Sequence, residues 1–135
     1  MDKTLNYLAL ARKAGFAELG EEPVGAAARS GKAYVILVAK DASDHTWRRS
    51  LSFAAGTEQQ CIRLPYTKDE MGLAIGRTAL AVAAITDVAL ALALVSSLPQ
   101  PPAHVLEVLQ TKTQKAKRRK AEAKAHQKNV RKGKK

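Results

Sequence analysis

The fold of this chain is decided by residues 18–43, which read ELGEEPVGAAARSGKAYVILVAKDAS. They predict a glycine turn, a short alanine-rich helix, a second glycine turn and then a buried strand. Residues 33–38 (AYVILV) are continuously apolar and rich in β-branched residues, as is typical of a strand covered on both faces. Polar residues follow at its carboxyl end, where open α/β sheets usually hold their ligands. We therefore expect any binding site to lie near these turns.

The rest of the chain alternates helices and strands around that stretch. Apolar spacing predicts further helices over residues 2–13, 44–55, 67–76 and 88–98, and strands over residues 16–19, 59–64 and 80–85. Thr67 and Glu70 match a capping box, and Asp87 is placed to cap the last of these helices. In the helix over 44–55, Trp47 and Leu51 are expected on the inner face. The alternation predicts an α/β fold, a three-layer αβα sandwich.

Charge divides the chain into parts. The formal net charge is +11, and from Lys112 onward there are twelve Lys and Arg against one acid, Glu122, whereas residues 1–111 hold eleven of each sign. Together with the prolines after residue 98, this predicts a domain over 1–98, a proline-containing linker over 99–111 and a basic arm over 112–135. The arm has too little apolar surface to offset its ordering entropy, so we expect it to be disordered or a solvated helix when free, and helical when bound.

The basic arm is the plainest functional signal in the sequence. Its densest block is Lys117, Arg118, Arg119 and Lys120. Such blocks bind nucleic acid through counterion release and carry little base information. A solubility tail or a contact with an acidic membrane is the alternative. Because no aromatic residue or leucine follows Leu109, the arm has no apolar face to insert into lipid, and polyanion binding is the preferred interpretation.

Several other classes of protein are disfavoured. The single cysteine, Cys61, excludes an intramolecular disulfide, offers no zinc set and suits a reducing compartment, so we expect a cytoplasmic protein. Residues 80–98 are apolar enough to raise the question of a membrane span. Asp87 lies near the middle of that run, where it would cost roughly 2.5–3.5 kcal/mol in a bilayer. We therefore expect a soluble protein without a membrane partner.

No group of residues predicts catalysis. The three histidines, His45, His104 and His126, fall in a helix start, the linker and the arm. Cys61 is most simply a small core residue in a short strand. No phosphate-cradling glycine motif with lysine occurs. We expect no enzyme activity, no cofactor and no metal.

Three short motifs occur in register along the chain. They are Gly20-Glu21-Glu22 at a helix start, residues 38–43 (VAKDAS) after the buried strand and residues 71–77 (MGLAIGR) before the last strand. Together they resemble the kink-turn-binding ribosomal protein superfamily, and most of all its small bacterial YlxQ-type branch, over most of residues 1–98. The resemblance implies a mixed four-stranded sheet, no catalysis and a monomer that binds structured RNA, with ribosomal RNA and the ribosome as the expected partners.

The resemblance also implies which residues contact RNA. In that superfamily the glycine turn and the helix start approach the kinked RNA backbone, and the loop after the fourth helix covers a flipped-out nucleotide. Carried over to this sequence, the expected contacts are Gly20, Glu21, Glu22, Lys40, Asp41, Gly76, Arg77 and Thr78, with Lys32 reaching phosphate from beside Gly31. This assignment requires the turns at Gly20 and Gly76 to lie on the same side of the molecule.

A second interpretation stays open at the helix that follows Gly20. The well-characterised RNA binders have an asparagine or lysine, then a glutamate or glutamine, and a lysine one turn later, where this chain has Glu22, Pro23 and Ala26. Carboxylates at a helix N-terminus also stabilise the helix by roughly 0.3–1 kcal/mol per charge. The alternative is a protein-interaction adaptor on the same fold that has lost kink-turn recognition. Arg77 and the basic arm favour RNA.

Overall fold

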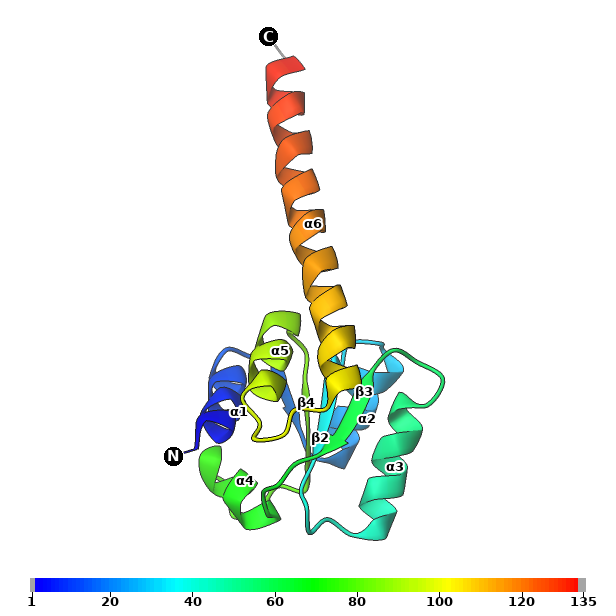
Figure 1. Ribbon diagram of the computed structural model, residues 1–135, viewed down its shortest axis with the longest axis vertical. Helices are drawn as coiled ribbons and strands as arrows, with labels where there is room; N and C mark the ends of the chain where they lie inside the picture. Colours follow the sequence, from blue (N-terminus) through cyan, green and yellow to red (C-terminus); the bar gives the residue numbers. More distant parts are fainter. Residues whose placement is uncertain (1, 134–135) are drawn as a thin grey trace.

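The computed structural model describes residues 2–133, and side chains as far as residue 126. Helices and strands alternate along the first 85 residues, and two helices close the described chain (Figure 1). In chain order the elements are α1 (Lys3–Lys13), β1 (Ala17–Leu19), α2 (Glu21–Arg29), β2 (Val35–Val38), α3 (Asp44–Ala54), β3 (Gln60–Arg63), α4 (Lys68–Ala74), β4 (Val82–Ile85), α5 (Val88–Ser96) and α6 (Ala103–Gly133).

The four strands form one mixed sheet in the order β1-β4-β2-β3. β4 runs antiparallel to both of its neighbours, and β2 runs parallel to β3. The expected edge strand before α2 is therefore confirmed as β1. All four residues of β2 and all four of β4 are buried, as expected for the central strands of a sheet covered on both faces.

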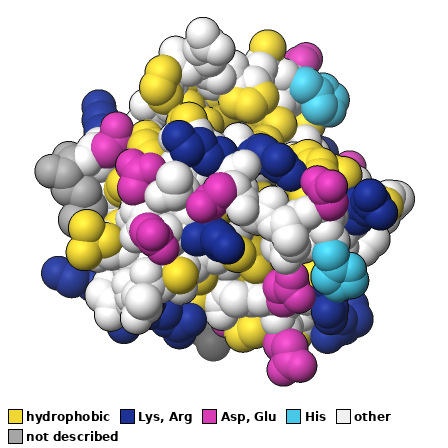
Figure 2. All heavy atoms as spheres, turned by 90° about the horizontal axis from the view of Figure 1, so that it is seen from below, with side chains coloured by type: hydrophobic (Ala, Val, Ile, Leu, Met, Phe, Trp, Pro, Cys, Tyr) yellow, Lys and Arg dark blue, Asp and Glu magenta, His cyan; other side chains and the backbone are white. Residues whose placement is uncertain are grey.

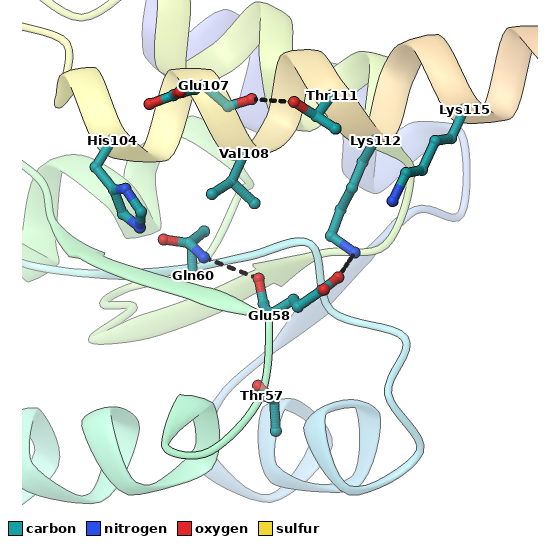
Figure 3. A pocket seen from close by; sticks show the side chains of 9 residues that line it. All are labelled: Thr57, Glu58, Gln60, His104, Glu107, Val108, Thr111, Lys112 and Lys115. Carbon is teal, nitrogen blue, oxygen red and sulfur yellow. Dashed lines mark hydrogen bonds and ion pairs between the residues drawn. The ribbon is translucent and has the colours of Figure 1, made fainter.

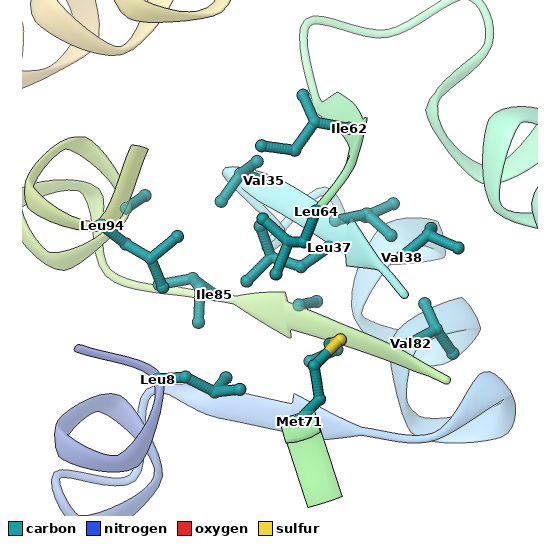
Figure 4. Close-up of a cluster of buried hydrophobic side chains, with 14 of the residues drawn as sticks. Leu8, Val35, Leu37, Val38, Ile62, Leu64, Met71, Val82, Ile85 and Leu94 are labelled. Atoms are coloured by element: carbon teal, nitrogen blue, oxygen red, sulfur yellow. The ribbon is translucent and has the colours of Figure 1, made fainter. Parts of the chain in front are cut away.

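Helices cover both faces of this sheet, which confirms the αβα sandwich. α2 and α3 pack together on one face, and α1, α4, α5 and the first part of α6 lie on the other. Figure 4 shows the core from close by: Leu8, Met71 and Leu94 come from three different helices and surround the central strands. Burial of this apolar surface is the main favourable term in folding.

The predicted helix caps are present. Thr67 and Glu70 form a complete capping box at the start of α4, and the Asp87 side chain accepts from the Leu90 amide at the start of α5. Asp2 caps α1 and also accepts a 2.6 Å hydrogen bond from the Tyr66 hydroxyl. That bond holds the pKa of Asp2 below its ordinary value. The amino end of α1 is thereby tied to the segment between β3 and α4.

The expected inner face of α3 is wrong at one position. Trp47 is half-buried, but Leu51 is 42% exposed. The buried stripe instead follows Trp47 through Ser50 to Phe53 and Ala54, which keeps the 3.6-residue period. Ser50 can occupy this stripe because its hydroxyl donates to the Thr46 carbonyl at 2.8 Å.

The expected linker over residues 99–111 is part of the folded domain. α6 begins at Ala103, and Val105 and Leu109 are buried in the same core as the sheet. The prolines after Leu98 turn the chain back onto α5, and the apolar stripe of α6 then packs there. The boundary at residue 98 therefore has to move to at least Leu109. Residues 112–133 continue the same helix away from the domain (Figure 1), and residues 134–135 of the expected arm lie outside the described residues.

Two helices bear on the question of a membrane span. α5 is apolar but has nine residues, and α6 has 31 residues but is strongly charged. Within residues 2–133 no helix combines the length and the apolar character needed to cross a membrane.

Leu109→Ala tests whether α6 belongs to the domain. Leu109 is fully buried, so the substitution should lower the free energy of unfolding by about 2–4 kcal/mol through lost burial and a cavity. Urea unfolding followed by circular dichroism measures this. Gln110→Ala, at an exposed neighbour, should change it by no more than about 0.5 kcal/mol. Equal small effects would place Leu109 outside the cooperative core.

Candidate functional site

Sheet topology gathers four connecting segments at one end of the molecule, here called the loop end: the turn at Gly20 and residues 39–43, 64–67 and 75–81. The Gly20 amide donates to the Val82 carbonyl, and the Ala39 amide donates to the Ala81 carbonyl, both at 2.9 Å. The turn before α2 and the end of β2 thus flank the start of β4. The segment over residues 75–81, which contains Gly76, leads into β4 at this same end.

Glycines shape the backbone on both sides of this end. Gly20 has a φ of 97° and Gly76 a φ of 73°, which L side chains rarely adopt. Gly72 has a different role: a Cβ there would lie 2.6 Å from the Cα of Ala79. α4 and the returning loop therefore touch backbone to backbone. This contact positions residues 76–78 beside the start of β4.

Two of the expected RNA contacts hold the protein together. Glu21 accepts a 2.8 Å hydrogen bond from the Thr46 hydroxyl and pairs with Arg49 at 3.4 Å, which joins α2 to α3. Asp41 accepts from the Lys68 amide at 2.8 Å, which joins the loop after β2 to the start of α4. Both carboxylates are thus occupied within the chain.

The other expected contacts at the loop end are exposed. Glu22, Lys40, Arg77 and Thr78 all face solvent. Leu73, one turn before Arg77, is 77% exposed, the largest exposure among the large hydrophobic side chains of the described chain. The pattern of apolar residues in α4 did not predict that the Leu73 side chain faces solvent.

A groove of about 440 Å³ opens beside Lys40 at the same end. Arg63 lines this groove, and its guanidinium lies over the Trp47 ring, 4.6 Å from the ring centre. The apolar wall comes from Pro65 and from Pro99 and Pro102, which precede α6. Sequence reasoning missed Arg63 because the proline segment was expected to be a linker away from the sheet.

Charges of both signs are mixed at the loop end. Figure 2 views the molecule from below, toward this end, and Lys and Arg side chains alternate there with Asp and Glu. Such a surface has little net field with which to attract a polyanion. Any binding here would depend on shape and on individual contacts.

The remaining expected contacts lie at the opposite end of the sheet, here called the arm end: residues 30–34, 56–60 and 86–87. The Lys32 amide donates to the Ala27 carbonyl, and the next amide, that of Ala33, donates to the Gln59 side chain. Lys32 and Lys40 are therefore separated by the length of β2. The arm cations Lys117, Arg118, Arg119 and Lys120 are exposed on α6, beyond this end.

α6 leaves the domain beside the loop that precedes β3. Lys112 donates to Glu58 at 2.6 Å (Figure 3). This pair and the charge of Lys115 lower the pKa of Glu58, so Glu58 stays ionised at pH values where an ordinary glutamate begins to protonate, and the pair is lost as pH falls through the lowered pKa. A groove of about 470 Å³ lies between this part of α6 and the start of β3.

Residues with catalytic or metal-binding potential are scattered. The described residues contain no group of three His, Cys, Asp or Glu side chains placed to hold a metal ion. Cys61 is half-buried in β3, and this burial raises the pKa of its thiol to about 11.

Comparison with known proteins supports the fold. No protein-family model and no curated protein matches this chain. A solved protein of unknown function from Bacillus halodurans C is similar over 74% of this chain and 100% of its own, with 24% identity and a TM-score of 0.68. The Giardia lamblia 15.5kD RNA binding protein is similar over 79% of this chain and 84% of its own, with 16% identity and a TM-score of 0.60. This chain shares the αβα fold of both proteins.

Gly72→Ala should disturb the loop end from within. The added Cβ meets the backbone of Ala79 at 2.6 Å, so the loop over 76–80 must move, at a cost of roughly 1–3 kcal/mol. Urea unfolding measures the loss, and amide chemical shifts of residues 77–80 report the movement. The matched control, Leu73→Ala at an exposed position of the same helix, should leave both unchanged. Undisturbed shifts in Gly72→Ala would contradict the close contact.

The Cys61 thiol should be slow to alkylate in the folded protein. With a pKa of about 11 instead of 9.0, about 1% of it is thiolate at pH 9, against half for an ordinary cysteine. Iodoacetamide labelling at pH 9, followed by mass spectrometry, should therefore be about fifty-fold slower without urea than with it. Equal rates would show that Cys61 is open to solvent.

Proposed function

We propose that this protein is a non-catalytic RNA-binding protein whose loop end docks on folded RNA. The observation that carries the proposal is that the turn at Gly20 and the loop at Gly76 flank the start of β4. A single bent or looped RNA can then contact both. The RNA-binding structural neighbour from Giardia lamblia supports the same class of ligand.

The loop end offers the types of contact that structured RNA requires. Gly20 allows the backbone at the start of α2 to approach a phosphate closely, and the amides of a helix N-terminus favour an anion. Arg77 can contact a phosphate with two hydrogen bonds or stack on a base. Leu73 offers an apolar surface to an unstacked base. Lys40 and Arg63 border a groove at the same end of the molecule.

The mixed charge of this end favours recognition of shape over general attraction. Nonspecific binding to RNA is mostly electrostatic, so a loop end with little net field should bind unstructured RNA weakly. A kink-turn-like ribosomal RNA is the RNA we propose, on the resemblance to the kink-turn-binding superfamily and its YlxQ-type branch. The protein would act as a cytoplasmic monomer, at or on the ribosome.

A protein-interaction adaptor remains the second candidate, and Leu73 favours it. An exposed leucine bordered by charges of both signs also suits a small protein interface. The internal bonds of Glu21 and Asp41 leave fewer groups to read bases. The two candidates differ in whether the loop end binds RNA without help from the arm.

The test uses the full chain with its arm block neutralised by Lys117→Gln, Arg118→Gln, Arg119→Gln and Lys120→Gln. Fluorescence anisotropy compares a kink-turn RNA with an unstructured RNA of equal length at two salt concentrations. We expect a preference for the kink-turn RNA at both. Adding Arg77→Ala should weaken that binding by about ten- to a hundred-fold, the value of one or two charge-assisted hydrogen bonds.

Lys32→Ala is the matched control, because it removes one positive charge at the opposite end. It should leave the preference unchanged. Equal losses from Arg77→Ala and Lys32→Ala would remove Arg77 from the site. If the arm-neutralised chain prefers neither RNA, the loop end is not an RNA-binding surface and the adaptor is the better candidate.

A further inference from the structure

We infer that one molecule holds two separate RNA segments, one at the loop end and one along the outer part of α6. The inference rests on the proposed function for the first segment. For the second segment, the inference rests on the position of the arm cations. The loop end and the arm cations lie at opposite ends of the molecule, as Figure 1 shows, with α4 at the lower end and the outer part of α6 at the upper.

The distance between these surfaces is large compared with electrostatic screening. From Lys112 to Lys124 a helix rises about 18 Å, and the four residues of β2 add about 13 Å. The outermost described cations therefore stand roughly 30 Å from the loop end. The Debye length in physiological salt is about 8 Å. The arm cannot strengthen RNA binding at the loop end through its field, so it must contact other phosphates.

The first turns of α6, here called its root, fix the direction in which the arm leaves the domain. Val105 and Leu109 are buried against the domain, and Lys112 pairs with Glu58 at the point where the helix leaves it (Figure 3). Residues 117–126 are all exposed. To bring the arm back to the loop end, the helix would have to break after Thr113 or lose its buried root. Either change would cost free energy, whereas the straight helix keeps all of these contacts.

The arrangement of the arm cations indicates the kind of partner. Lys117, Arg118, Arg119 and Lys120 are consecutive, and each helical residue turns by about 100°, so their side chains point to all sides of the helix. A flat anionic surface such as a bilayer meets one side of a helix. Folded RNA presents phosphates on several sides of a groove and can meet most of these cations. The second segment is therefore RNA, held by its phosphates without reading of bases.

The two ends have complementary roles in this arrangement. The loop end has mixed charge and selects one RNA shape, whereas the arm is almost entirely positive and accepts many sequences. A protein of this kind brings a second RNA helix to a recognised element, either within one folded RNA or between two molecules. It would act as a clamp between RNA segments.

A two-RNA assay with the full chain tests the clamp. A kink-turn RNA is immobilised, protein is bound, and a fluorescent RNA duplex without a kink-turn is added at about 0.1 M salt. The native chain should retain the duplex. The chain with the four arm substitutions to glutamine should still bind the immobilised RNA but retain at least tenfold less duplex. Native mass spectrometry should show one protein with one RNA of each kind.

A charge-preserving control separates phosphate contact from base reading. Lys117→Arg, Arg118→Lys, Arg119→Lys and Lys120→Arg keep every charge, so the duplex should be retained as by the native chain. Loss of the duplex in this variant would overturn contact by phosphates alone. Two proteins in each two-RNA complex would overturn bridging by a single molecule.

The failure of the clamp can be told from the failure of the proposed function. If the native chain selects the kink-turn RNA but never retains the duplex, the outer part of α6 holds no second RNA segment and the clamp is wrong. If the arm-neutralised chain does not select the immobilised RNA, the proposed function of the loop end is wrong. A chain that selects the kink-turn RNA without retaining the duplex would therefore support the proposed function of the loop end while excluding the clamp.

Discussion

The antiparallel pairing of β4 with both β1 and β2 is the constraint on which the arrangement depends. It brings the end of β1, the end of β2 and the start of β4 to one edge, where Gly20 and Ala39 each donate a backbone hydrogen bond to the β4 segment. Every residue of β4 is buried, so its register cannot slip without moving apolar side chains out of the core. The positions of the loops are thus fixed by the burial of a strand that has no functional side chain of its own.

Structural features that depend only on residues close together in the sequence could be predicted from the sequence. The apolar runs that became β2 and β4, and the caps at Thr67 and Asp87, are local patterns, and the structure has them where the sequence predicts them. The packing of the first turns of α6 against the domain could not be predicted in this way. Prolines before it suggest the end of a domain, and whether Leu109 packs depends on a free groove along α5, which only the tertiary structure provides.

The sequence predicted the location of the candidate site better than it predicted the role of each residue there. The motif order put Gly20, Lys40 and Arg77 near one edge, and the topology agrees. Glu21 bonds to Thr46, and Asp41 to Lys68, so their occupation depends on residues 25 and 27 positions away. No local pattern reports such bonds. Lys32 shows the converse: it is close to Gly20 in sequence, yet the intervening helix carries it to the other end of the sheet.

The separation of the two ends also explains why the net charge of the chain is a poor guide to the charge of its loop end. A charge of +11 suggests a basic face, but the excess lies on a helix whose outer part extends beyond the domain. At the loop end, carboxylates that stabilise helix starts and join elements cancel the local cations. Because screening confines each charge to its own neighbourhood, the folded domain behaves as a neutral body with respect to any ligand it selects. In the proposed function, selectivity and affinity can then be changed independently, one through the glycine-shaped loops and the other through the length and charge of α6.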